Sequence, residues 1–240
     1  MIEDVTARFN ATQWMARLLI ILLWTLALLG PVALMLGYFE RSLLYAIKEL
    51  SFVSEKEMHA AAQTSDRNVM IIGILQLIVG IASIILWFVW VFRSNKLARA
   101  LGATAMKYSP GWSVGWFFVP IMNLFKPYFA MKEIYLATMD PKSFDTEQEV
   151  EDQPKSLNIM KLWWLVYLVD SWLGRIAFRL TMRAETIDQL ITANGLMLAS
   201  DAATIAASLT TIWLVREFAE KQQAAYGVAQ AQPDPQTTSV

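Results

Sequence analysis

Four long apolar stretches alternate with polar stretches along the chain, at residues of about 18–39, 69–92, 159–180 and 190–215. A helix needs about 20 mainly apolar residues to cross the hydrocarbon core of a bilayer. Each stretch reaches that length, so each is predicted to be a membrane-spanning helix. The pattern therefore predicts an all-α integral membrane protein with four transmembrane helices.

Between the first two predicted spans, apolar residues recur at helical spacing, at Leu43, Leu44, Ile47 and Leu50. This spacing predicts a short amphipathic helix on the surface. Ser65 or Asp66 would then cap the second span, because such side chains accept the free N–H groups of a first helical turn.

The end of the chain differs from the rest in composition. Residues 221–240 are mostly polar and include prolines. A segment of this kind cannot bury enough apolar surface to fold, so it is predicted to be a disordered tail. Residues 1–220 are accordingly predicted to form the four-span membrane domain.

An unusual aromatic segment, residues 109–139, lies between the second and third predicted spans and begins SPGWSVGWFFVPIMNLFKPY. Its uncharged core of 17 residues is short for a span, and Pro110 and Pro120 interrupt any regular helix. Pro127 suits the first turn of a helix that would continue to about Met139. We therefore expect an interfacial or shallow re-entrant helical segment here, and not a further crossing.

Composition narrows the possible functions. Hydrophobic residues make up 56% of the chain and charged residues 17%, against about a quarter in soluble domains. The chain has no cysteine, one histidine (His59) and a net charge of −1. It contains no P-loop, zinc-protease or dinucleotide motif. We therefore expect a protein that is not an enzyme, has no cofactor or metal, and has no nucleic-acid partner.

The distribution of basic residues predicts the orientation. With four spans, both termini share one side of the membrane with the long connection, and thirteen basic residues lie on that side against seven on the other. Arg93, Lys96 and Arg99 follow directly on the second span, where basic residues bias orientation most strongly. Both termini are therefore predicted to lie in the cytoplasm, with the chain in the cytoplasmic (inner) membrane.

Charged residues inside the predicted spans need partners, because an unpaired charge is costly at membrane depth. If the last two spans form a hairpin that turns near residue 187, Asp170 lies at the level of Thr204, and Arg175 comes close to Asp201. An intramembrane ion pair among Asp170, Arg175 and Asp201 is the first interpretation. The alternative is a polar path for an ion or proton.

The aromatic segment also contains a long ordered motif, SPGWSVGWFFVPIMNLFKPYFAMKEIY. This motif is similar to that of a bacterial membrane-protein family, Domain of Unknown Function 4328, with Phe117 and Tyr135 in place of two tryptophans. The preceding WVFRSNKLARALG and the later Trp163-Trp164 pair also resemble the family, and the dense match covers about residues 90–139. The resemblance implies a four-helix membrane domain, but no activity and no catalytic residue.

The motif has an architectural interpretation, in which glycines allow close approach and prolines set bends. The functional hypothesis is a groove that faces lipid or a ligand. Its lining would be Trp112, Trp116, Asn123, Lys126 and Tyr128.

The leading hypothesis is therefore a non-enzymatic membrane module that binds lipid or a partner membrane protein, which includes a second copy of the chain. It would use the aromatic segment and a stripe of small residues in the fourth span, Gly195, Ala199, Ala203 and Ala207, which allows close helix packing. The alternative is a transporter or channel subunit with a polar path at Asp170, Arg175 and Asp201.

Overall fold

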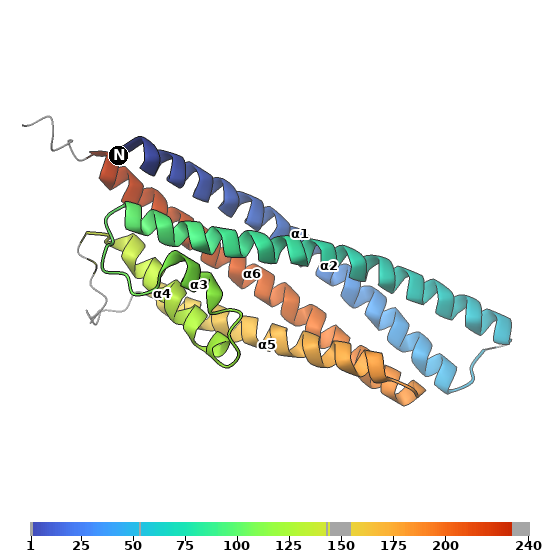
Figure 1. Ribbon diagram of the computed structural model, residues 1–240. Coiled ribbons are helices and arrows are strands. Elements are labelled where there is room, and N and C mark those ends of the chain that lie inside the picture. The colour runs from blue at the N-terminus through green and yellow to red at the C-terminus, as the bar shows by residue number, and fades with distance from the viewer. Residues whose placement is uncertain (1, 53, 143, 145–154, 232–240) are drawn as a thin grey trace, which may run out of the picture. The chain divides into compact units, whose positions relative to one another are not determined.

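The computed structural model describes residues 2–52, 54–142, 144 and 155–231, and these residues form helices and no strand. The predicted all-α class is confirmed. The described residues form four long helices and three short helical elements, which can be followed in Figure 1. The long helices are α1 (Ile2–Lys48), α2 (Glu55–Ala100), α5 (Lys155–Arg183) and α6 (Ile187–Ala231). The short elements are α3 (Pro110–Gly115), the 3-10 turn η1 (Met122–Leu124) and α4 (Lys126–Met139).

Three of these helices, α1, α2 and α6, are long and apolar enough to cross a membrane. This indicates a membrane protein. The third predicted span is helical as part of α5, but α5 is not among the three. Within the predicted span, residues 159–180, four charged residues lower the hydropathy: Lys161, Asp170, Arg175 and Arg179.

The helices that flank the first connection are longer than predicted. α1 continues to Lys48, so the expected separate amphipathic helix is its last part. α2 begins at Glu55, well before Ser65 and Asp66, which are therefore not its caps. The Ser54 hydroxyl instead accepts the N–H of Glu57 at 3.3 Å. A helix can continue through polar residues when they lie on its exposed face. The polar stretch between the first two spans was therefore wrongly taken for a break in the helices, with a separate short helix and a cap at Ser65 or Asp66.

The predicted tail, residues 221–240, is also corrected. α6 continues to Ala231, and the rest of that segment lies outside the described residues. Gln222 is fully buried, and the Tyr226 ring stacks on Phe9 with the two centroids 4.1 Å apart. The contact with Phe9 of α1 buries Tyr226 in this part of α6. The polar composition of residues 221–240 does not reveal such a contact.

The chain divides into two compact units. Unit 1 comprises Met1–Ile21, Ile84–Leu162 and Ile212–Val240, and unit 2 comprises Leu22–Ser83 and Trp163–Thr211.

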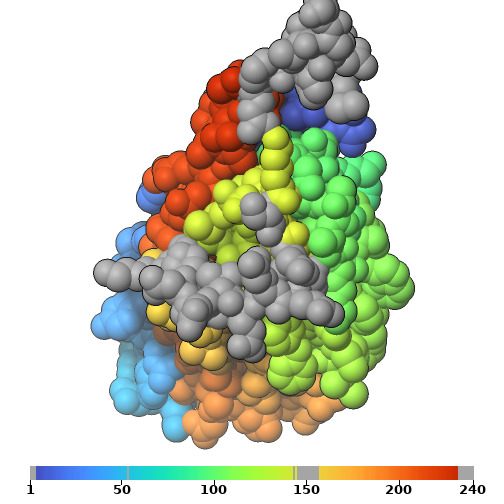
Figure 2. Space-filling model, turned by 90° about the vertical axis from the view of Figure 1, so that its left-hand side faces the viewer, coloured from blue at the N-terminus to red at the C-terminus, as the bar shows by residue number. Residues whose placement is uncertain are grey.

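In unit 1, α4 packs against the last part of α6. Tyr135 and Trp90 are buried and place their rings against Phe218, with centroids 5.1 Å and 5.4 Å away. The Tyr135 hydroxyl donates to Glu217 at 2.8 Å. Figure 2 shows the yellow-green residues of α4 between the red end of α6 and green residues that precede α4 in the chain.

In unit 2, α5 and α6 form the predicted antiparallel hairpin. Thr204 donates its hydroxyl to Asp170 at 2.7 Å, as expected from a turn near residue 187. Farther from the turn, Trp163 Nε1 donates to the Thr211 hydroxyl at 3.0 Å. The hairpin is therefore held by polar contacts at two levels.

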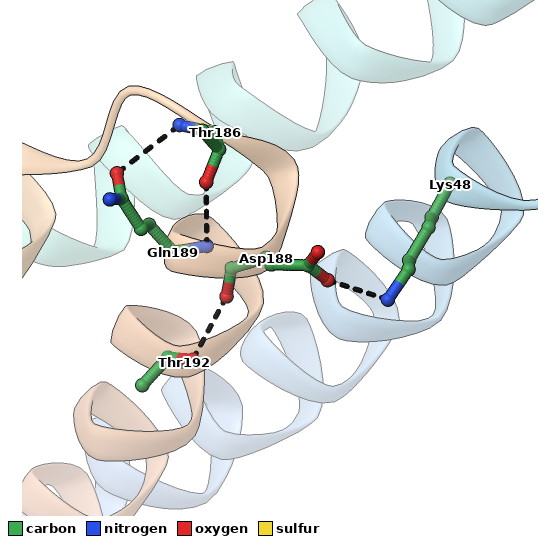
Figure 3. A network of polar contacts seen from close by, with 5 residues as sticks. All are labelled: Lys48, Thr186, Asp188, Gln189 and Thr192. Carbon is green, nitrogen blue, oxygen red and sulfur yellow. Dashed lines mark hydrogen bonds and ion pairs between the residues drawn. The ribbon is translucent and has the colours of Figure 1, made fainter.

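The start of α6 explains where this hairpin turns (Figure 3). Thr186 accepts the N–H of Gln189, and Gln189 accepts the N–H groups of Thr186 and Glu185. This reciprocal pattern is a capping box, which satisfies the free donors of the first turn. Asp188 adds an ion pair of 2.6 Å with Lys48 of α1.

α1 and α6 approach closely in unit 2 because α1 presents glycines to α6. A β-carbon at Gly30 would overlap the side chain of Ile205, and one at Gly37 would lie 2.8 Å from Leu198. The two glycines are seven residues apart, as are their two partners, so they recur on one face of each helix.

Candidate functional site

The predicted interfacial segment, which we call the platform (residues 109–139), is built from short pieces. The Ser109 hydroxyl accepts the N–H of Trp112 and begins α3, which ends at Gly115. Ile121 has a φ of +66°, a left-handed backbone that is uncommon for a β-branched residue and marks a tight turn. α4 then begins at Lys126 with Pro127 in its first turn, as predicted. The platform contains no helix long enough to cross a membrane.

Glu133 of α4 holds the loop that enters the platform. Its two carboxylate oxygens accept the N–H groups of Lys107 at 2.6 Å and Tyr108 at 2.9 Å. Glu133 is only 7% exposed. A charge that accepts two backbone hydrogen bonds can be stable at such a site, because these bonds replace its hydration.

Glutamate is usually exposed, so the residue type alone does not predict that Glu133 is buried. The helical period contained the correct signal. Counted from the buried Ala130 as position i, Glu133, Ile134 and Ala137 stand at i+3, i+4 and i+7, so all four lie on one buried face of the helix.

Asn95 and Arg99 of α2 complete the polar support of the same loop. The fully buried Asn95 donates to the Tyr108 carbonyl and to the Ser113 hydroxyl, both at 2.9 Å. Arg99 donates to Asn95 Oδ1 at 3.0 Å and to the Met106 carbonyl at 2.9 Å. Arg99 was predicted only to bias orientation, so its structural role was missed.

The structure brings together three of the five residues predicted to line a groove. The rings of Trp112 and Trp116 are tilted against each other with centroids 4.6 Å apart. Lys126 Nζ lies 5.7 Å from the Trp116 ring and 5.9 Å from the Tyr108 ring, within the range of cation–π attraction. Tyr108 was not among the predicted residues.

The other two predicted residues lie apart from this cluster. Asn123 is part of η1, and Tyr128 of α4 makes an edge contact with Phe129 at 5.5 Å. Within the described part of the chain, no hydrogen bond or ring contact joins either residue to Trp112, Trp116 or Lys126. Burial raises the pKa of the Tyr128 hydroxyl, which therefore stays a neutral donor.

The outer side of the platform is apolar and open. Several large side chains there are about half or more exposed: Trp112 (53%), Phe118 (68%), Ile121 (71%), Phe125 (58%) and Phe129 (49%). These side chains lie outside the long helices, and large exposed apolar side chains of this kind are typical of interaction surfaces.

The predicted ion pair of Arg175 with Asp201 is not present among the ion pairs of the described residues. Asp201 accepts a long hydrogen bond of 3.5 Å from Gln76, and Asp170 is bonded to Thr204. Arg175 is exposed. Arg175 follows Asp170 by five residues, which separates the two side chains by about 140° around the helix. When Asp170 faces α6, Arg175 therefore points away from it.

The fold and the platform define an all-helical membrane protein with an apolar surface outside its long helices. The chain belongs to the family described as Domain of unknown function (DUF4328), whose model matches residues 54–220. The resemblance seen in the sequence is thus confirmed. No curated protein and no solved structure matches the chain.

Proposed function

We propose that the chain is a non-enzymatic membrane module whose platform lies in the lipid headgroup layer and binds lipid there. One observation carries the proposal: the platform is polar on its inner side and apolar on its outer side. The inner polar groups are bonded to Glu133, Asn95 and Arg99. The outer side exposes side chains such as Phe118 and Ile121.

The chemistry of the platform suits a membrane interface. An indole such as that of exposed Trp112 combines an apolar ring with a polar N–H, and such rings favour the headgroup layer. The Lys126 ammonium group lies near the rings of Trp116 and Tyr108, and its positive charge can attract an anionic headgroup. The lipid favoured by this arrangement therefore has an anionic headgroup.

The proposed side of the membrane is the cytoplasmic one, with both termini on the same side. The basic residues near the end of α2, such as Arg93 and Lys96, support this orientation. An impermeant maleimide applied to intact cells tests it through single cysteines, because the chain contains no native cysteine. A cysteine at Thr104 should stay unlabelled until the cells are opened.

Single cysteines also test the position of the platform. Spin labels at Phe118 and Phe125 report collisions with oxygen, which concentrates in lipid, and with a water-soluble nickel complex. Ile78 of α2, 59% exposed, is the lipid reference. Thr104, in the exposed loop before α3, is the water reference.

We expect labels at Phe118 and Phe125 to collide more with oxygen and less with the nickel complex than the label at Thr104, with values between those of Thr104 and Ile78, as the headgroup layer requires. Labels that resemble Thr104 would show that the platform lies in water and would refute the proposal. Labels shielded from both reagents would show that protein covers this surface, either a partner or a second copy of the chain.

Lipid binding itself can be measured by native mass spectrometry of the chain released from its own membranes. Wild type should retain phosphatidylglycerol, and the double variant Trp112→Ala with Lys126→Ala should lose it. Trp172→Ala is the matched control, because Trp172 is also 53% exposed but lies on α5. Equal retention by all three proteins would contradict lipid binding at the platform.

The alternative is a transporter or channel subunit with a polar path at Asp170, Arg175 and Asp201. The structure offers it less support, because Arg175 is exposed and Asp170 is bonded to Thr204. Flux across vesicles that contain the purified chain, abolished by Asp170→Asn, would favour this alternative over the lipid-binding module.

A further inference from the structure

Unit 2 contains a partly enclosed cavity of about 230 Å³ that is lined mainly by α1, α2 and α6. Three carboxylate residues line it, one from each of these helices: Glu40, Asp66 and Asp201. No lysine or arginine is among its described lining residues. The cavity therefore combines a small volume with an excess of negative charge.

The carboxylates have few partners in the described part of the chain. None of the three forms an ion pair there. The hydrogen bond from Gln76 to Asp201 is 3.5 Å long, which is the upper limit for such a bond. Arg41, next to Glu40 in sequence, donates instead to the carbonyl of Ile191 at 3.1 Å.

Asn194 is a second and independent sign of a ligand. It lines the cavity and is only 6% exposed. Its Nδ2 donates to the Gly37 carbonyl at 3.0 Å and to Glu40 at 2.9 Å. Its Oδ1 is buried and has no hydrogen-bond partner among the described residues. Buried acceptors normally have a donor, so this oxygen lacks an N–H or O–H group.

We propose that this cavity binds a small organic ammonium ion. An ammonium group supplies a positive charge to balance the carboxylates. Its N–H groups can also donate hydrogen bonds to the oxygen atoms of Asn194 and Asp201. The remaining lining is largely aliphatic, including Leu44, Ile72 and Leu198, and suits a short alkyl chain. The inference uses residues of unit 2 only and does not depend on lipid binding at the platform.

Size and geometry select this ligand class. Pockets for drug-sized ligands have about 300–1,000 Å³, so a cavity of about 230 Å³ fits a smaller molecule. The described residues contain no group of three acidic side chains close enough to hold a metal ion. A more open groove between α1 and α2 shares Leu36 and Val69 with the cavity and offers a way in.

The test uses n-butylammonium as the probe and isothermal titration calorimetry of the full chain in detergent at constant ionic strength. We expect saturable binding to wild type and at least tenfold weaker binding to Asp201→Asn and to Glu40→Gln. Glu55→Gln removes an exposed carboxylate at the start of α2 and should bind like wild type. Uncharged n-butanol, of similar size, should not bind.

Three outcomes would overturn the proposal. The first is no saturable binding of n-butylammonium to wild type. The second is equal binding by wild type, Asp201→Asn and Glu40→Gln, with circular dichroism showing that the variants are folded. The third is displacement of n-butylammonium by millimolar Mg²⁺, which would assign the site to an inorganic cation. If one variant fails to fold, Asp66→Asn replaces it in the comparison.

Discussion

Glu133 of α4 accepts the backbone N–H of Tyr108 at 2.9 Å, although 25 residues separate them in the chain. The other oxygen of the same carboxylate accepts the N–H of Lys107. One side chain thus joins the loop before α3 to α4. The arrangement of the platform depends on this anchor, because it ties α4, the last part of the platform, to the loop that enters the platform.

Replacing this carboxylate tests the anchor. Glu133→Gln keeps the size and shape of the side chain, but only one oxygen remains to accept hydrogen bonds from the N–H groups of Lys107 and Tyr108. We expect the free energy of unfolding in detergent to fall by about 1.5–3 kcal/mol. Glu220→Gln, at an exposed position of α6, is the control and should change little. Equal stability of both variants would show that the loop does not need the carboxylate.

The close approach of α1 and α6 gives a second prediction. In Gly30→Ala the new methyl group would overlap the side chain of Ile205, so we expect a loss of about 1–3 kcal/mol. Gly80→Ala, in α2, has no neighbour within 4 Å of its new methyl group and should be neutral or slightly stabilising.

A compensating change makes this test more specific. Ile205→Ala would empty the space that the methyl group of Gly30→Ala needs. The double variant should therefore be more stable than the sum of the two single effects predicts. Strict additivity would mean that Gly30 and Ile205 do not touch.

The contact between Asp170 and Thr204 gives a third prediction. Thr204→Val removes the hydroxyl that donates to the carboxylate and should lower the free energy of unfolding by about 1–3 kcal/mol. Thr192→Val is the control on the same helix, because the Thr192 hydroxyl is exposed and bonds only its own helix. Adding Asp170→Leu to Thr204→Val should recover stability, since both polar partners are then gone.

The last part of α6 gives a fourth prediction. Tyr226→Ala removes the ring that stacks on Phe9 and the hydroxyl that donates to Thr6 at 2.8 Å. We expect a loss of about 3 kcal/mol, measured as a lower midpoint of thermal unfolding. Val228→Ala, two residues later and 62% exposed, should leave the midpoint unchanged. An unchanged midpoint for Tyr226→Ala would support the disordered tail predicted from composition.

Several features were predictable because they depend on neighbouring residues or on a simple period. Long apolar runs predicted the helices. Pro127 predicted the start of α4, because proline is tolerated in a first helical turn. The hairpin of α5 and α6 placed Asp170 opposite Thr204, because antiparallel helices with a known turn pair residues at equal distances from it.

Other features were decided only by the tertiary structure. Asp201 meets Gln76 of α2 and not Arg175, because the partner depends on which helix lies beside α6 and which face it presents. The last part of α6 folds because Phe9 of α1 covers Tyr226, a contact between the two ends of the chain.

The sequence by itself determined the class of this protein, its helices and its family, because composition, helical period and motif are properties of short stretches. The tertiary structure alone decided which charges are buried, which helix faces meet, and where a cavity remains. Glu133 and Glu55 show the difference: both are helical glutamates, yet only Glu133 is buried. Burial depends on what packs against a residue, and those neighbours come from distant parts of the chain.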